Sequence, residues 1–142
     1  MVKKISRSSK NALDTNTIIR LLREEPQTCR KFDNAVERGD EIIIPPLVHY
    51  EIRRGFLCKP APKREKLYEI LIGQYPVGEM NAEILECGAV IYANLYHAMK
   101  TVDDTDLLIA AFCMDGEYTL VTNNKKHFDV IPGLKVVDWA VE

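Results

Sequence analysis

The stretch Glu41-Ile42-Ile43-Ile44-Pro45-Pro46 decides the fold class of this chain. Its continuous β-branched run has no polar alternation, which is typical of a strand buried on both faces. The two prolines that follow favour the first turn of a helix, which we expect to continue through Phe56. A buried strand that leads directly into a helix indicates a parallel sheet covered by helices.

The same alternation of strand and helix extends along the rest of the chain. We expect further strands at 12–13, 118–122 and 134–137, and helices at about 18–25, 28–38, 62–74 and 104–112. One more helix is predicted by apolar residues at steps of three and four, namely Leu85, Ala89, Tyr92, Tyr96 and Met99. Strands joined by helical crossovers predict an α/β fold with a mostly parallel sheet flanked by helices on both faces.

Length and charge limit the possible organisation. The chain has 142 residues, which suits one domain, and a formal net charge of −2. Residues 1–10 hold four basic and no acidic residues, so the other 132 residues hold 15 basic against 21 acidic ones. We therefore expect a basic N-terminal tail over 1–10 and a single acidic domain over 11–142. An acidic body favours either plain solubility or a site that collects cations.

Nothing in the sequence predicts export or membrane insertion. The longest apolar run, Leu107 to Met114, is far shorter than the roughly 20 residues that span a bilayer. The basic start is followed by polar residues rather than an apolar signal segment, so we expect a cytoplasmic protein. The four cysteines lack zinc-type spacing and are expected to be reduced thiols: Cys29, Cys58, Cys87 and Cys113.

Several acidic residues follow strands or begin helices. Asp14 comes directly after the first strand, Glu51 lies beside the apolar stripe of the helix after Pro46, and Asp104 and Asp106 begin another helix. Because ligands collect at the carboxyl ends of parallel strands, we expect these acids to converge there. Carboxylates gathered without His or Cys suit Mg²⁺ or Mn²⁺, ions that serve phosphodiester hydrolysis.

Each acid also has a purely structural interpretation. Asp14 can cap a helix, and an acid at the start of the 104–112 helix can cap it or interact with its dipole. Glu51 can pair with Arg53 or Arg54. The segment Thr122-Asn123-Asn124 can be a turn, or a polar edge that positions water, metal or phosphate.

The order of these motifs resembles that of PIN domains. Ala12-Leu13-Asp14-Thr15-Asn16 resembles their opening block, and Ile44-Pro45-Pro46 through Glu51-Ile52 their second. Asp104-Thr105-Asp106-Leu107-Leu108-Ile109-Ala110-Ala111 is similar to their third block. Leu120-Val121-Thr122-Asn123-Asn124 through Phe128, with Ile131 to Val136 and Trp139, resembles the closing block of the VapC toxin branch.

The resemblance implies a PIN fold, RNase H-like in broad outline, and a metal-dependent endoribonuclease with Mg²⁺ or Mn²⁺ as cofactor. It implies a toxin that is neutralised by a cognate antitoxin and that forms a homodimer. Asp14, Glu51 and Asp106 match the catalytic, metal-binding acids, and Asp104 matches an accessory metal position. Polar residues in supporting positions are Thr15, Asn16, Thr122 and Asn124.

The sequence departs from that pattern in the closing block. PIN domains often carry a fourth acid either two residues after the Thr or just before the Phe, and those places hold Asn124 and His127 here. We therefore expect one well-occupied metal position rather than two.

Other functions stay open at this point. A PIN nuclease of RNA processing without an antitoxin, or a non-cleaving RNA-binding PIN domain, fits the same motifs. Asp14-Thr15-Asn16-Thr17 resembles the aspartyl-nucleophile motif of haloacid-dehalogenase-like phosphotransferases, except that Asn16 replaces an Asp. A receiver-like domain is also possible from Lys125 after the late strand, although it requires paired acids that Asn16 interrupts.

Overall fold

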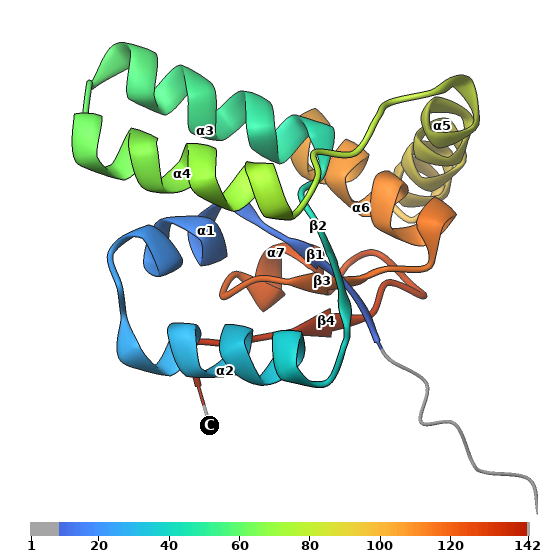
Figure 1. Ribbon diagram of the computed structural model, residues 1–142. Helices are drawn as coiled ribbons and strands as arrows, with labels where there is room; N and C mark the ends of the chain where they lie inside the picture. Colours follow the sequence, from blue (N-terminus) through green and yellow to red (C-terminus); the bar gives the residue numbers. More distant parts are fainter. Residues whose placement is uncertain (1–8, 142) are drawn as a thin grey trace, which may run out of the picture.

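A parallel sheet of four strands, in the order β2-β1-β3-β4, forms the centre of the computed structural model, which describes residues 9–141 (Figure 1). The strands are β1 (Lys10–Leu13), β2 (Glu41–Ile43), β3 (Thr119–Val121) and β4 (Val136–Val137). β1 pairs in parallel with β2 and β3, and β3 pairs in parallel with β4. The predicted parallel sheet is confirmed.

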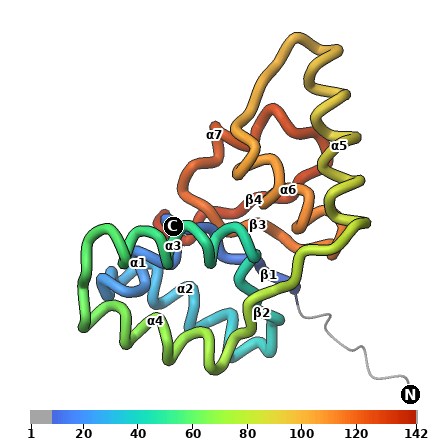
Figure 2. The backbone as a smooth tube through the Cα atoms, turned by 90° about the horizontal axis from the view of Figure 1, so that it is seen from above, coloured from blue at the N-terminus to red at the C-terminus, as the bar shows by residue number. Residues whose placement is uncertain are grey.

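Helices connect and flank these strands. Within residues 9–141 they are α1 (Thr15–Leu22), α2 (Pro26–Glu37), α3 (Pro46–Cys58), α4 (Pro62–Gln74), α5 (Ala82–His97), α6 (Asp104–Gly116) and α7 (Lys125–Phe128). Figure 1 shows α3 and α4 side by side above the strands, α2 below them, and α5 and α6 to one side. Figure 2, from above, again places α5 next to α6 and away from the α3–α4 pair. The predicted α/β fold is confirmed.

The helix starts follow local sequence signals in most places. Proline occupies the first turn of α2, α3 and α4, where its missing N–H leaves no hydrogen bond unmade. Asn81 caps α5, because its side chain accepts from the N–H of Ile84 at 2.9 Å. The expected side-chain cap of α6 is wrong: Asp103 is at the N-cap, but its carboxylate accepts no capping hydrogen bond. The short helix α7, which was not expected from the sequence, follows directly after Thr122-Asn123-Asn124.

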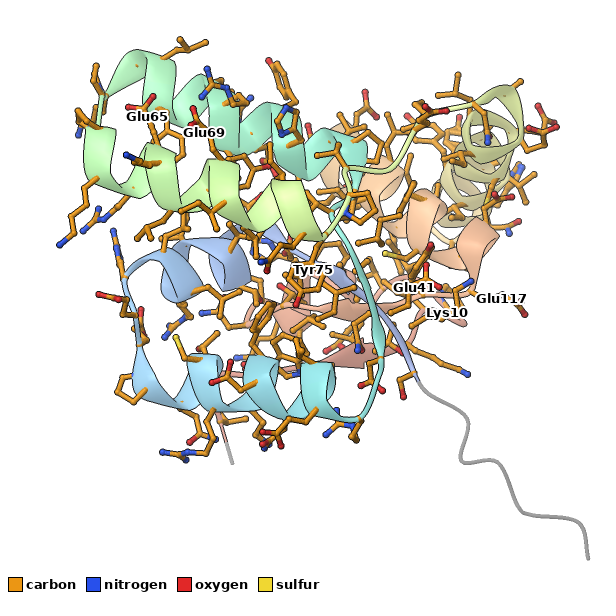
Figure 3. All side chains as sticks on the ribbon, viewed as in Figure 1. Lys10, Glu41, Glu65, Glu69, Tyr75 and Glu117 are labelled. Carbon is orange, nitrogen blue, oxygen red and sulfur yellow. The ribbon has the colours of Figure 1, made fainter. Side chains whose placement is uncertain are left out.

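The core joins both faces of the sheet to the helices. Leu13 of β1 and Val121 of β3 are fully buried and lie in register, and Ile109 of α6 is also fully buried. On the α2 side, Phe32 makes edge-to-face contacts with Tyr75 and Trp139, at centroid distances of 5.4 and 6.2 Å. Figure 3 shows Tyr75 at the end of α4, between that helix and the strands. These contacts tie the end of α4 and the last described segment to α2.

The apolar stripe that identified α5 lies on the exposed side of the helix. Tyr92 is 54%, Tyr96 66% and Met99 94% exposed, whereas the buried residues of α5 are Ile84, Gly88, Ile91 and Leu95. The reason is that α5 carries two apolar stripes, and the one with the smaller residues packs on α6. An added Cβ at Gly88 would lie 3.1 Å from Cδ2 of Leu108, so glycine permits this close contact.

At the amino ends of the strands, a polar cluster includes Lys10 and Glu41, which Figure 3 labels on one side of the sheet. Lys10 Nζ donates to the carbonyl of Gly116 at 2.6 Å and lies 4.5 Å from the ring centre of Tyr118. The Tyr118 hydroxyl donates to Glu41 at 2.7 Å. The predicted basic tail lies mostly outside the described residues, and its last residue, Lys10, begins β1.

Two smaller expectations concern thiols and membranes. All four cysteines are free thiols, as expected. In the part of the chain that the structure describes, no helix combines the length and the apolar character that crossing a bilayer requires.

Candidate active site

The three acids of the predicted site come from three different elements. Asp14 follows β1 directly, Glu51 lies on the second turn of α3, and Asp106 lies in the first turn of α6. α3 begins three residues after β2 ends, so Glu51 is carried to the same edge of the sheet as Asp14. The carboxyl edge thus brings Asp14, Glu51 and Asp106 together, close enough for Asp14 to be influenced electrostatically by both of the others.

Asp14 is the most enclosed of the three acids, at 5% exposure. Oδ1 accepts from the N–H of Thr15 at 2.9 Å, and Oδ2 accepts from the hydroxyl of Thr122 at 2.7 Å. A third and longer contact, 3.4 Å, comes from the side-chain amide of Asn16. Asp14 is therefore the N-cap of α1 as well as a predicted site acid, because the backbone bond to Thr15 caps the helix.

Thr122 is the hub of the support around Asp14. Its buried hydroxyl accepts from the side-chain amide of Asn16 at 3.2 Å and from the N–H of Asn124 at 3.0 Å. Asn16 Oδ1 accepts from the N–H of Asn123 at 3.1 Å, which closes the loop after β3 onto α1. Asn124 contributes through its backbone, since its side chain makes no hydrogen bond within the described residues.

Thr17, which was named from the sequence only within the phosphotransferase-like motif at 14–17 and not as a site residue, joins the same network. Its hydroxyl donates to the carbonyl of Val121 at 2.9 Å and is buried at 2% exposure. The only signal for it is a polar residue in the first turn of α1, next to the buried Ile18. Through this bond α1 is fastened to the end of β3.

Glu51 faces the site with one carboxylate oxygen and an arginine with the other, and both interpretations had been open from the sequence. Oε1 accepts from the hydroxyl of Thr15 at 2.7 Å, on the side of the other acids. Oε2 lies 3.7 Å from a guanidinium nitrogen of Arg54, one turn further along α3. The Arg54 side chain is 55% exposed, so this ion pair is weak and leaves Glu51 available to the site.

Asp106 lies in a more open environment. Its side chain is 25% exposed, and Oδ2 lies 3.8 Å from Nδ1 of His127 on α7. The acids whose charges act on Asp106 are Glu51 and, to a smaller degree, Asp103. Asp104 is exposed, and within the described residues no hydrogen bond or ion pair connects it to the other acids.

The electrostatics of the site are those of an acid cluster without enough positive charge. Burial raises the pKa of Asp14, the hydrogen bonds from Thr122 and Thr15 oppose that rise, and the charges of Asp106 and Glu51 add to it. Burial also raises the pKa of Asp106, and the charge of Glu51 adds to the rise while His127 opposes it. Such a site is stabilised by a cation.

One hollow lies beside Glu51 and another lies beside Asp106. One of about 290 Å³ lies among α1, α3 and α4, with Glu51 and Thr15 at one end; Ile19, Leu22, Ile52 and Phe56 form its apolar lining. A further hollow of about 270 Å³ continues it past Leu22 along α4. The other, of about 430 Å³, lies beside Asp106, between the start of α6 and α7, and includes Lys126 and His127.

The donors suit a hard divalent cation in type, because all three are carboxylates. Burial, and to a lesser degree the charges of the neighbouring acids, raise the pKa values of Asp14 and Asp106, and a bound cation would oppose both effects. Within residues 9–141, however, no three His, Cys, Asp or Glu side chains are gathered closely enough to hold an ion in their present orientations. Side chains that bind an ion would therefore have to turn toward it, and the partly exposed Glu51 and Asp106 have the space to do so.

Known proteins resemble this chain over nearly its whole length. Ribonuclease VapC19 of Mycobacterium tuberculosis is 24% identical over 123 residues, which are 87% of this chain and 95% of the relative. The tRNA(fMet)-specific endonuclease VapC of Salmonella typhimurium is 28% identical over 129 residues, or 90% and 96% of the two chains.

Solved structures share the fold. The structure of VapBC2 from Rickettsia felis, bound to a DNA fragment from its promoter, matches with a TM-score of 0.83 at 23% identity, over 92% of this chain and 98% of the other. DNA-bound VapBC from Salmonella typhimurium matches with a TM-score of 0.81 at 26% identity, over the same shares.

The family description "PIN domain" matches residues 12–134, which include the three acids and the Thr122 network. The resemblance inferred from the sequence is confirmed by this match and by the VapC ribonucleases among the relatives. This chain belongs to the PIN domain family.

Proposed function

We propose that this protein is a metal-dependent endoribonuclease and the toxin of a toxin–antitoxin pair. The observation that carries the proposal is the convergence of Asp14, Glu51 and Asp106 at the carboxyl edge of the sheet, inside a PIN domain whose relatives are VapC ribonucleases. The absence of a nucleophilic Ser or Cys among these residues favours attack by water on the RNA phosphodiester.

In this proposal Asp14, Glu51 and Asp106 hold Mg²⁺ or Mn²⁺. The ion, when bound, supplies charge neutralisation at the phosphate and a more acidic water. The protein's own contribution is orientation. Thr122 and the N–H of Thr15 fix the Asp14 carboxylate, and the Thr15 hydroxyl fixes one oxygen of Glu51. The hydrogen bonds to Asp14 favour its charged form, and all three bonds hold the carboxylates in fixed directions. Binding of a cation requires charged and oriented carboxylates.

The number of ions follows from the fourth position of the family pattern. Asn124 provides no negative charge, and His127 lies against Asp106 as a base rather than an acid. We therefore propose one resident ion held by three acids, with Asp104 outside the set because it is exposed and unconnected to them in the described residues.

A cleavage assay on total RNA tests the activity. The purified protein should produce discrete RNA fragments with Mg²⁺ or Mn²⁺ and none with excess EDTA, and Glu51→Gln should lose the activity while its circular dichroism spectrum is unchanged. Cleavage that survives EDTA or this substitution would reject the proposed chemistry. RNA binding without cleavage by the wild type would instead favour the non-cleaving PIN domain.

A cytoplasmic ribonuclease has to be restrained, and the hollows along α1, α3 and α4 suit a protein segment. Their lining is apolar, whereas Arg23, Lys59 and Arg64 lie at the rim and Glu51 at one end. We propose as occupant an amphipathic segment of the antitoxin, with acidic residues toward the rim and an Arg that reaches Glu51 in bidentate fashion.

Growth on overexpression tests this partner. The chain should arrest growth when expressed alone and should not do so together with the product of a small open reading frame beside its own. A Phe56→Asp variant should keep its RNA cleavage and escape this rescue. Harmless overexpression of an active enzyme without any partner would favour the RNA-processing nuclease that lacks an antitoxin.

We also propose that the expected homodimer forms through α5. The exposed stripe of Leu85, Tyr92 and Tyr96 is apolar over several turns of the helix. Two antiparallel copies of α5 around a two-fold axis would pack this apolar stripe against itself. Tyr92→Lys should convert a dimer to a monomer in sedimentation equilibrium, and a wild type that is already monomeric would reject this surface.

A further inference from the structure

The hollow beside Asp106 has a wall of opposite charge to the acids. Lys126 and His127 of α7 form this wall of the hollow, which Asp103 and Asp106 also line. The body of the protein is acidic, so basic side chains placed next to an acid cluster need an explanation. The ion pair of His127 with Asp106, at 3.8 Å and with a 63% exposed imidazole, leaves most of the imidazole free.

The position of Lys126 and His127 is fixed by the buried residue that follows them in α7. Phe128, the next residue in α7, is 2% exposed and anchors the helix. The N–H of His127 donates to the carbonyl of Asn124 at 3.0 Å, and the N–H of Asn124 donates to Thr122 at 3.0 Å. The wall is therefore connected by two hydrogen bonds to the residue that orients Asp14.

Charge balance indicates what the wall binds. Three carboxylates and one divalent ion leave a net charge of about −1, to which each RNA phosphate adds another negative charge. Lys126 supplies a permanent positive charge, and the imidazole of His127 can donate a hydrogen bond in its neutral and in its protonated form. These are the groups that position phosphate oxygens in protein–nucleic acid contacts.

We propose that Lys126 and His127 bind an RNA phosphate in the hollow between α6 and α7, next to the scissile bond. In this assignment they are substrate-positioning residues, and His127 stands where the family pattern often has an acid. The inference rests on the proposed nuclease function and adds the site of one backbone contact. A second divalent ion is then not needed there, because the Lys126 ammonium meets the substrate directly.

Binding of a short 5′-fluorescein-labelled single-stranded RNA of mixed sequence, measured by anisotropy, tests the assignment. Ca²⁺ replaces Mg²⁺ in these titrations, and an intact-RNA gel accompanies each point. Lys126→Ala should weaken binding by roughly three- to tenfold and lower the slope of log K against log salt by about one. Lys66→Ala, which removes an exposed lysine of α4, is the matched control and should change neither quantity.

His127 needs a separate variant because it also contacts Asp106. His127→Asn keeps a hydrogen-bond donor and should bind RNA better than His127→Ala, whereas Mn²⁺ binding without RNA should be the same for Lys126→Ala and wild type. RNA affinity equal to wild type in both Lys126→Ala and His127→Ala would overturn the assignment.

The test separates this inference from the proposed function. If the wild type cleaves RNA in an EDTA-sensitive manner while Lys126→Ala and His127→Ala both bind RNA normally, the nuclease proposal stands and the phosphate site fails. If the wild type never cleaves but Lys126→Ala still loses RNA affinity, the phosphate site stands and the cleavage proposal fails.

Discussion

The two sides of the acid cluster are built in opposite ways. The Asp14 side is enclosed, and its carboxylate accepts from Thr122 at 2.7 Å and from the N–H of Thr15 at 2.9 Å. The Asp106 side is open, and among residues 9–141 its carboxylate has only His127, at 3.8 Å, as a polar partner. Burial is the largest cause of the raised pKa at both acids, yet hydrogen bonds oppose it only at Asp14.

The enclosed side is suited to orienting a bound ion, and the open side is suited to admitting substrate. A carboxylate held by short bonds on a strand end keeps its direction whatever is bound, which is suited to fixing an ion. A carboxylate at a helix start beside a hollow can turn and admits substrate. The enclosed side therefore determines whether the site exists, and the open side determines what reaches it.

The largest expected effect is at the centre of the enclosed side. Asp14→Asn removes one charge at nearly constant shape, and cleavage should fall by more than about 100-fold because the most fixed ligand is lost. The measurement is the initial rate on RNA with Mg²⁺. Asp33→Asn, which neutralises an exposed acid of α2, is the control and should keep the wild-type rate. Comparable rates for Asp14→Asn and wild type would remove Asp14 from the site.

The next effect concerns the hydroxyl that orients Asp14. Thr122→Val keeps the shape and removes the 2.7 Å bond, so cleavage should fall by about 10- to 100-fold at limiting Mg²⁺. Thr122→Ser restores the donor and should recover most of the rate. Equal cleavage rates for Thr122→Val and Thr122→Ser would mean that Thr122 contributes only packing. The hydrogen bond to Asp14 would then not distinguish the two sides of the site.

A gain is expected from Asn124→Asp. The new carboxylate restores one acid of the family pattern and should lower the Mg²⁺ concentration at half-maximal cleavage by about threefold. Wild type and variant are titrated side by side, with Asn94→Asp on α5 as a control for added charge. An unmoved midpoint, or two tightly bound ions in the wild type without RNA, would contradict the single-ion site.

The smallest expected effect concerns stability against pH without metal. The pKa of Asp14 is raised above the 3.8 of an unperturbed carboxyl, so the native state holds more protons than the unfolded state between 3.8 and the folded pKa. The free energy of unfolding in EDTA should therefore fall as pH rises through this interval, and less so for Asp14→Asn. Urea unfolding at several pH values measures this free energy. If it changes with pH equally in wild type and Asp14→Asn, burial does not raise the pKa of Asp14.

Much of the fold was predictable because local signals and buried strands agree. The β-branched run at 41–44 and the helix at 62–74 were found at or near their observed bounds, since prolines and apolar patterns mark them. The exposed side of α5 was not predictable, because Tyr92 and Tyr96 recur at the same helical spacing as core residues. Periodicity identifies a helix but does not say which of two apolar stripes is buried.

At the candidate site, the acids could be predicted from the sequence, but their different environments could not. Position after a strand was enough to bring Asp14 and Glu51 to one edge, because the strands are parallel. The hub role of Thr122 and the bond from Thr17 depend on contacts across more than 100 residues, for which no local pattern exists. The place of His127 beside Asp106 depends on α7, a helix too short to leave a periodic signal.

The bond between Thr122 and Asp14 joins residues that are 108 positions apart, and this separation has a consequence during synthesis. A nascent chain that has not yet released β3 from the ribosome has no partner strand for that side of β1, and no hydroxyl for Asp14. The enclosed side of the site can then form only after most of the polypeptide has been made. Translation itself thus delays the completion of the acid site until β3 has left the ribosome.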